Sequence, residues 1–302
     1  MKTILITGAT GLVGQEIVKQ CHAKGFAVHY LSTRKSKLKD KTNYKGFYWN
    51  PSQGEIDSAC FNGVDTVINL AGGSISKRWT KSYKQEIIES RTQSLKLLYH
   101  TIKKEKIAIN HLVSASAIGY YPDSLTHFYE EDYASTEKGF LQKVVSLWEQ
   151  EANAFKQLNI NVSIIRIGIV LAKDGGALME LVKPIKAFVG SPLGSGKQWQ
   201  SWIHLEDLAS LFLFAIENNN YGILNGVAPN AVKQREMVKT IAKVLERPLI
   251  LPKVPAFVLK LMLGEMSAIV LESQRVSSNK VEALGFNYTY HHLQPALEDL
   301  LR

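Results

Sequence analysis

The segment that most constrains the fold of this chain is the glycine-rich run Thr7-Gly8-Ala9-Thr10-Gly11-Leu12-Val13-Gly14. A β-branched run at residues 3–7 precedes it, and a helical pattern at 12–24 follows it. Gly8 and Gly11 would let a tight turn bring its backbone close to a pyrophosphate, and Gly14 would let the helix pack closely on the strand. The helix would point its free N–H groups at that ligand. The run therefore predicts a dinucleotide site rather than a helix-start loop that binds nothing.

Strand and helix patterns alternate over the first half of the chain. Short apolar runs with few charges predict buried strands at 3–7, 27–32, 66–70, 109–114 and 161–167. Longer patterns predict helices at 12–24, 81–106 and 136–158. This order predicts an α/β fold with a doubly wound parallel sheet covered by helices.

The pattern changes after Leu171, where Gly-rich and Pro-rich loops appear. Helices are predicted at 205–217 and 232–246, with a short strand near 223–225 between them. We predict a dinucleotide-binding domain at 1–175 and a smaller α/β substrate domain at 176–302, with about 201–225 returning to the first domain. Lys260, Gly264 and Glu265 interrupt the apolar segment 254–271, which predicts a buried amphipathic helix rather than a membrane span.

The end of the second predicted strand indicates which dinucleotide binds. A site for NAD needs an acid about 20 residues after the glycine run to hold the ribose 2′-hydroxyl. No acid lies between Glu16 and Asp40. The chain has Thr33 and Arg34 there, and an arginine fork suits a 2′-phosphate. The predicted cofactor is NADP, whereas a solvated basic loop accounts better for the neighbouring lysines, Lys37, Lys39, Lys41 and Lys45.

Composition narrows the class of protein. The 302 residues carry 36 Lys plus Arg against 27 Asp plus Glu, a net charge of 36 − 27 = +9. No nucleic-acid-binding motif accompanies this charge, which speaks to solubility and steering rather than to function. Cys21 and Cys60 make neither a disulfide framework nor a metal cluster, and no signal peptide is visible. We expect a cytoplasmic protein with a small-molecule substrate and no nucleic acid, membrane or metal partner, of unknown oligomeric state.

Two further motifs follow later strands, Asn69-Leu-Ala-Gly-Gly73 and Ser114-Ala-Ser-Ala-Ile-Gly-Tyr-Tyr121. With the glycine run they resemble the extended short-chain dehydrogenase/reductases, the nucleotide-sugar epimerase class. Other motifs resemble its atypical epimerase-like subfamily, whose proteins carry labels such as "epimerase family protein" and "cell division inhibitor". They are Arg78-Trp79, Glu89-Ser-Arg91, Trp148-Glu149, Arg166-Ile-Gly-Ile-Val-Leu171, Gly175-Gly-Ala-Leu178, Gly194-Ser-Gly-Lys-Gln-Trp199, Trp202-Ile-His204, Asn225-Gly-Val-Ala-Pro229 and Leu263-Gly-Glu265.

The resemblance implies a Rossmann-type fold and assigns a cofactor-binding set. Its members are Gly8, Thr10, Gly11, Leu12, Val13 and Gly14 in the pyrophosphate loop, Thr33 and Arg34 at the 2′-phosphate, and Leu70, Ala71, Gly72, Glu86, Arg91, Ser114 and Val170 elsewhere along the cofactor. For Glu86 and Arg91, a solvated pair on one helix remains the alternative.

The catalytic pattern of that class is broken here. Active members carry Tyr-x-x-x-Lys on the helix after the serine strand, where the ammonium lowers the tyrosine pKa. In this chain the tyrosine position falls near Phe140 or Leu141 and the lysine position near Val144 or Val145. The Tyr99 to Lys103 match lies one helix too early and is not expected to act. The remaining catalytic candidates are Ser116, Tyr120, Tyr121 and His204, although the aromatic pair and the histidine also suit packing and helix capping.

Three residues of the second half are candidates for substrate binding: Gln198, Trp199 and Trp202. Beside a glycine loop they could line a pocket for a ring-bearing ligand. The sequence thus supports an NADP-dependent oxidoreductase or epimerase on a small molecule or sugar nucleotide. The alternative is a catalytically silent NADP sensor, because the Tyr/Lys pair is missing.

Overall fold

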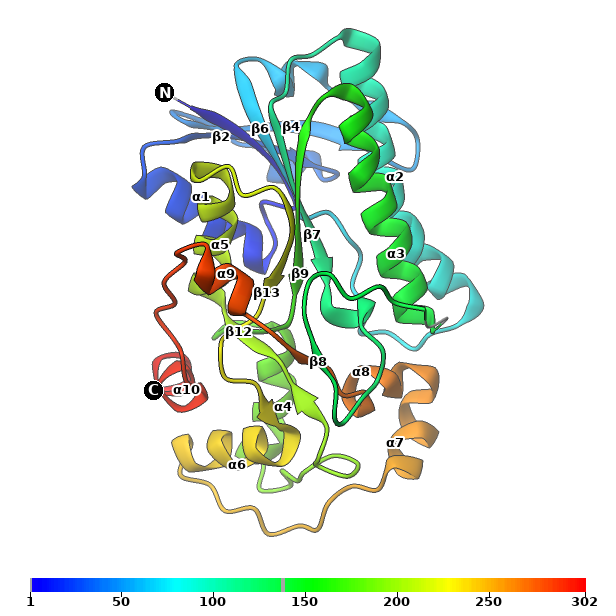
Figure 1. The fold of residues 1–302 in the computed structure, drawn as a ribbon, viewed down its shortest axis with the longest axis vertical. Helices are drawn as coiled ribbons and strands as arrows, with labels where there is room; N and C mark the ends of the chain where they lie inside the picture. The colour runs from blue at the N-terminus through cyan, green and yellow to red at the C-terminus, as the bar shows by residue number, and fades with distance from the viewer. Residues whose placement is uncertain (1, 137–138) are drawn as a thin grey trace.

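A central parallel sheet organises the computed structural model, which describes residues 2–136 and 139–302 (Figure 1). Within these residues the sheet has nine strands, and seven of them run parallel. Their order is β13 (Gly222–Gly226), β9 (Asn161–Ile167), β7 (His111–Ala117), β6 (Val64–Asn69), β1 (Thr3–Thr7), β2 (Ala27–Ser32) and β4 (Tyr44–Asn50). The short strands β3 (Asp40–Lys41) and β5 (Glu55–Ile56) pair antiparallel with β4.

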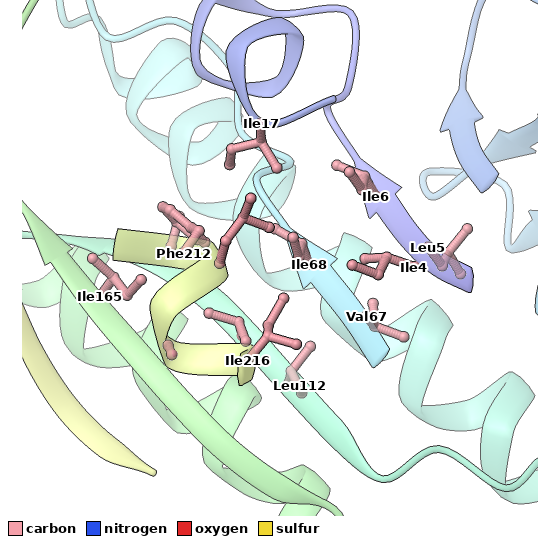
Figure 2. Close-up of a cluster of buried hydrophobic side chains, with 14 of the residues drawn as sticks. Ile4, Leu5, Ile6, Ile17, Val67, Ile68, Leu112, Ile165, Phe212 and Ile216 are labelled. Carbon is pink, nitrogen blue, oxygen red and sulfur yellow. The ribbon is translucent and has the colours of Figure 1, made fainter. Parts of the chain in front are cut away.

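Helices cover both faces of this sheet. α1 (Leu12–Ala23) and α5 (Leu205–Glu217) lie on one face, and α2 (Lys81–Glu105) and α3 (Phe140–Asn153) lie on the other (Figure 1). Ile17 of α1 and Phe212 of α5 pack with Ile68 and Ile165 of the strands in one fully buried cluster (Figure 2). The doubly wound α/β fold predicted from the sequence is confirmed.

A smaller unit follows β9 and has its own core. β10 (Ile169–Leu171) pairs with β12 (Trp202–His204), and the buried ring of Trp202 packs in the cluster that also holds Leu171. Three helices contribute to this cluster: α4 (Gly176–Lys186), α6 (Gln234–Val244) and α10 (Leu293–Leu301).

Short elements complete the chain. The strands are β8 (Phe128–Tyr129), β11 (Trp199–Gln200), β14 (Val232–Lys233) and β15 (Arg275–Val276), and the helices are α7 (Ala256–Leu263), α8 (Ala268–Leu271) and α9 (Asn279–Ala283). α5 and β13 fall in the segment that we expected to return to the first domain, and they lie on the main sheet (Figure 1).

The structure differs from the sequence predictions at three places. β4 was missed because Lys45 and Gly46 interrupt its apolar pattern, yet Gly46 is needed, since a Cβ there would lie 2.5 Å from the Tyr30 ring. The predicted helix 136–158 is α3 followed by a 3-10 turn at Ala154–Leu158, and its residues 137 and 138 lie outside the described residues.

The third difference concerns the predicted buried helix at 254–271, which is wrong. α7 buries only Leu259 and exposes three large apolar side chains. No helix in the described part of the chain is both long and apolar enough to cross a membrane.

The central sheet contains a buried histidine that makes the fold sensitive to acid. His111 Nε2 lies 2.7 Å from Ser163 Oγ, and burial lowers the pKa of His111 from 6.5 to about 4. Between these two pH values the unfolded chain binds a proton that the folded chain does not, so stability falls as the pH drops. We predict that His111 accounts for a loss of about 3 kcal/mol of unfolding free energy over this range. Urea unfolding of His111→Gln at pH 7 and pH 4.5 should show a smaller loss than the native chain, and an equal loss would contradict the assignment.

Candidate active site

The glycine-rich loop has the geometry of a phosphate cradle. Gly8 adopts a left-handed φ of 71°, and a Cβ on Gly14 would lie 2.2 Å from the Gly8 carbonyl oxygen, so the helix start packs directly on the loop. Gly11 caps α1 without any side-chain hydrogen bond to the first turn. The backbone N–H groups at the start of α1 therefore face the loop without a side chain of this chain competing for them.

The ends of three neighbouring strands are joined by buried polar side chains. Thr7, Asn69 and Ser114 are paired across β1, β6 and β7 and are fully buried. The Thr7 hydroxyl donates to Asn69 Oδ1 (2.8 Å), and the Asn69 amide donates to Ser114 Oγ (3.2 Å). The backbone amides of Leu70 and Ala71 donate to Thr7 Oγ1 at 3.0 and 3.1 Å. This fixes the turn after β6 beside Gly8, where a Cβ on Gly8 would lie 3.1 Å from Leu70.

Thr33 and Arg34 follow β2 at the same edge of the sheet. Both are exposed, and the Arg34 backbone N–H donates to Ser32 Oγ (3.1 Å), which sets the direction of the chain there. Because parallel strands end at one edge, Arg34 stands next to the loop that starts from β1.

The side chain of Glu86, on the first turns of α2, is exposed.

Arg91 lies under the turn that follows β6. Its guanidinium donates to the carbonyl oxygens of Ile87 (3.0 Å) and Gly73 (3.1 Å) and lies 5.2 Å from the Trp148 ring. A Cβ on Gly72 would touch it at 3.4 Å. Burial lowers the pKa of Arg91 to about 10. Arg91 is thus a cation held beside the predicted cofactor path. Its partners are buried backbone carbonyls, whereas the alternative was a solvent-exposed pair with Glu86.

The remaining cofactor candidates lie where β10 and α4 approach α1. Thr10, Leu12, Val13 and Val170 are half-buried. A Cβ on Gly176, at the start of α4, would lie 3.4 Å from a methyl of Leu12. The second unit therefore reaches the helix start that carries the glycine loop.

Ser116, the leading catalytic candidate, belongs to a buried ionic network. Its hydroxyl donates to Glu149 Oε1 at 2.6 Å. Arg166 pairs with both oxygens of that carboxylate, through Nε at 2.8 Å and Nη2 at 3.0 Å. All three residues are buried. Burial alone would lower the pKa of Arg166, but the hydrogen bonds and charge of Glu149 outweigh it and raise that pKa.

The network continues through the aromatic pair after β7. Arg166 Nη1 donates to the Tyr121 hydroxyl (3.1 Å), which donates to Asn225 Oδ1 (2.7 Å). Tyr121 is fully buried, and burial raises its pKa to about 12, so its phenol is a fixed hydrogen-bond partner. Tyr120 is half-buried, with the Arg166 guanidinium 3.6 Å from its ring centre. Of the two tyrosines, only Tyr120 is partly exposed.

The face of α3 that meets the end of β7 carries no Tyr/Lys pair. A Cβ on Gly119 would lie 3.3 Å from Leu141 and 3.9 Å from Val145, which places these two side chains at that contact. Glu149 stands one turn further on the same helix face. The Tyr99 to Lys103 match lies elsewhere, since Tyr99 packs on Phe155 and donates to Gln157.

His204 is placed by helix capping rather than with Ser116, contrary to the catalytic role considered above. Its Nδ1 accepts from the Glu206 backbone N–H (3.2 Å) at the start of α5. Its ring stacks on Tyr290 at 3.9 Å, and Nε2 lies 3.3 Å from the Asp299 carboxylate. Burial lowers the pKa of His204. Tyr290 and Asp299 belong to the second unit, Glu206 starts α5 on the main sheet, and none of the three belongs to the Ser116 network.

Two of the three substrate candidates are also part of the packing. Trp202 is fully buried, and its indole N–H donates to the Asn230 carbonyl (2.9 Å). The buried Gln198 amide donates to the carbonyl oxygens of Leu193 and Val270, both at 3.0 Å. Only Trp199 remains half-exposed, with its ring 4.5 Å from the guanidinium of Arg275. The sequence pattern did not show the burial of Trp202 and Gln198, because that burial depends on tertiary packing.

Sequence reasoning gave no role to Glu149, Arg166 or Asn225. The signal was present, since an arginine inside the apolar strand at residues 161–167 needs a buried partner. The packing of α3 decides which carboxylate pairs with Arg166, and residue spacing alone does not predict it.

Within the described residues, no group of three or more His, Cys, Asp or Glu side chains could hold a metal ion.

The Glu149–Arg166 pair should dominate the stability of this edge of the sheet. Glu149→Gln leaves the buried guanidinium without a counter-charge, and we expect it to lower the unfolding free energy by about 3 kcal/mol. Glu151→Gln is the matched control on the same helix, because Glu151 pairs with the exposed Lys96 at 3.4 Å. It should change stability by less than about 1 kcal/mol in the same denaturant titration. Equal effects of the two substitutions would contradict the buried pair.

Comparison with known proteins assigns the family. A model described as the NAD dependent epimerase/dehydratase family matches residues 4–226, and one described as Domain of unknown function (DUF1731) matches residues 254–300. The chain is 42% identical to an epimerase family protein of Staphylococcus haemolyticus over 302 residues, covering 100% of this chain and 99% of that protein. It is 40% identical to one of Staphylococcus aureus, with the same coverage.

Solved structures with a similar fold agree with this family assignment. Human epimerase family protein SDR39U1, solved with NADPH, has a TM-score of 0.85 and 29% identity, covering 99% of this chain and 98% of that one. UDP-N-acetylglucosamine 4-epimerase from Bacillus cereus shares the fold at a TM-score of 0.77 and 17% identity, with coverage of 99% and 98%. The chain therefore belongs to the NAD-dependent epimerase/dehydratase family and has its NAD(P)-binding Rossmann-type fold.

Proposed function

We propose that this protein is a cytoplasmic, NADP(H)-dependent oxidoreductase or epimerase acting on a small molecule. The observation that carries the cofactor preference is the end of β2, where Thr33 and Arg34 are exposed and no acid lies between Glu16 and Asp40. The NADPH of the human relative supports it, although other structural neighbours were solved with NAD. The free, buried Cys21 and Cys60 fit a reducing compartment.

The residues present fit a bound dinucleotide. Gly8, Gly11 and the start of α1 would hold the pyrophosphate, and Arg34 and Thr33 the 2′-phosphate. Leu70, Ala71 and Arg91 would line the path between the strand ends. When bound, NADPH would supply a hydride.

The reaction itself would fall to the Ser116 network. Because Ser116 donates its proton to Glu149, its oxygen is left to accept a hydrogen bond, which suits a substrate hydroxyl. Tyr120, held flat on Arg166, would be the nearby phenol. Glu149 would act as a positioning residue that fixes the Ser116 rotamer.

Arg34→Ala tests the cofactor preference. The native chain should bind NADPH more tightly than NADH, and the substitution should weaken NADPH binding by about 10- to 100-fold while leaving NADH unchanged. Lys37→Ala, in the same exposed loop, is the control and should keep the preference. Isothermal titration of the three proteins with each of the two cofactors measures this, and equal affinity of the native chain for both cofactors would refute it.

Ser116→Ala tests the catalytic role. NADPH oxidation is followed over a panel of carbonyl compounds, and epimer formation is followed over a panel of nucleotide sugars with NADP⁺ present. The variant should lose about 100-fold or more in kcat. Ser146→Ala, exposed on α3, should be unaffected. Unchanged turnover in Ser116→Ala would remove Ser116 from the mechanism. Tight NADPH binding without turnover of any substrate would favour the silent sensor instead.

A further inference from the structure

The helix α7 exposes its apolar side chains to solvent. Phe257, Leu261 and Met262 are 72%, 80% and 68% exposed, respectively. This is unusual, since soluble monomers rarely display large neighbouring apolar side chains without a partner. These three residues belong to the segment that the sequence predicted to be buried. They are not part of the second core.

The exposed face extends beyond α7 onto two neighbouring loops. Ser191 Oγ donates to the Pro252 carbonyl, and the Val254 N–H donates to the Pro192 carbonyl (2.9 Å), so the loop after α4 lies beside the loop before α7. Figure 1 shows the second loop running along one end of the molecule from α6 to α7. We call the exposed apolar residues of these segments the apolar rim: Phe188, Val189, Ile250, Leu251, Phe257, Leu261 and Met262.

Basic residues outnumber acidic ones around the apolar rim. Residues 180–197 and 246–265 contain six Lys or Arg and three Glu, which are Glu180, Glu246 and Glu265. Lys186, Arg247, Lys253 and Lys260 are exposed among the rim residues, and the Arg247 guanidinium lies 5.1 Å from the Phe188 ring. The rim therefore combines large apolar side chains with a net positive charge.

We propose that the apolar rim docks the protein on the surface of an anionic lipid bilayer. Apolar side chains with flanking lysines are the combination that holds a short helix at a membrane interface. A second copy fits less well, because a two-fold pairing of the rim would bring together two surfaces of net positive charge. The eight residues of α7 are too few to span a bilayer, so the contact is peripheral. The sequence led us to expect no membrane partner. It could not show that these apolar residues are exposed, because their exposure depends on tertiary packing.

Vesicle sedimentation with the full-length protein tests the proposal. The native chain should sediment with vesicles of phosphatidylcholine and phosphatidylglycerol, and much less with phosphatidylcholine alone. The double variant Phe257→Ser, Leu261→Ser should weaken partitioning by about tenfold or more. The double variant Lys253→Gln, Lys260→Gln should weaken it by about fivefold per lysine at low salt, and only for the anionic vesicles.

The matched control removes two exposed apolar side chains outside the rim. Tyr221 and Leu284 are 44% and 43% exposed, and Tyr221→Ser, Leu284→Ser should bind vesicles like the native chain. Circular dichroism melting confirms that each variant is folded. The proposal is overturned if the native chain ignores anionic vesicles, or if the Phe257/Leu261 variant binds as well as the control. It is also overturned if light scattering shows a dimer that this variant abolishes while vesicle binding is absent, because the rim would then serve a second copy.

Discussion

The buried ion pair between Glu149 and Arg166 is the interaction on which this end of the molecule depends. It joins α3 to β9 at the edge where the parallel strands end. Two buried charges are stable there only because each finds its partner and further hydrogen bonds. Ser116 from β7 and Asn225 from β13 complete the set, the latter through Tyr121. The Asn225 amide also donates to the Ser277 carbonyl (3.1 Å), which ties the C-terminal part of the chain to the sheet.

This network lies beside the positions on α3 where the resemblance places the acid–base pair of the class. Leu141 and Val145 cannot move a proton, and Glu149 on the same face of α3 holds Ser116 through a hydrogen bond. The chemistry that the family performs with Tyr and Lys would here have to use a serine fixed by a carboxylate, with Tyr120 stacked on the guanidinium. The Glu149 carboxylate accepts hydrogen bonds from both Ser116 and Arg166 and so fixes their geometry, which leaves the serine oxygen and the phenol as the reacting candidates.

Local patterns predicted the fold and the glycine loop well, because both depend on sequence spacing. The strand runs, the helix starts and the requirement for small residues at Gly8 and Gly14 are properties of a few adjacent residues. The roles of Trp202, Gln198 and His204 depend on tertiary packing, which brings Asn230, Val270 and Tyr290 to them from far along the chain. The exposed face of α7 was missed for the same reason. The sequence of an apolar segment does not show whether the rest of the protein buries it or leaves it exposed to solvent.

The most direct test of the account is a crystal structure of the protein with NADPH bound. The account predicts the 2′-phosphate within hydrogen-bond distance of the Arg34 guanidinium and the nicotinamide ring beside Ser116 and Tyr120, with Glu149 still paired to Arg166. A 2′-phosphate directed away from Arg34, or a nicotinamide ring out of reach of Ser116, would contradict it.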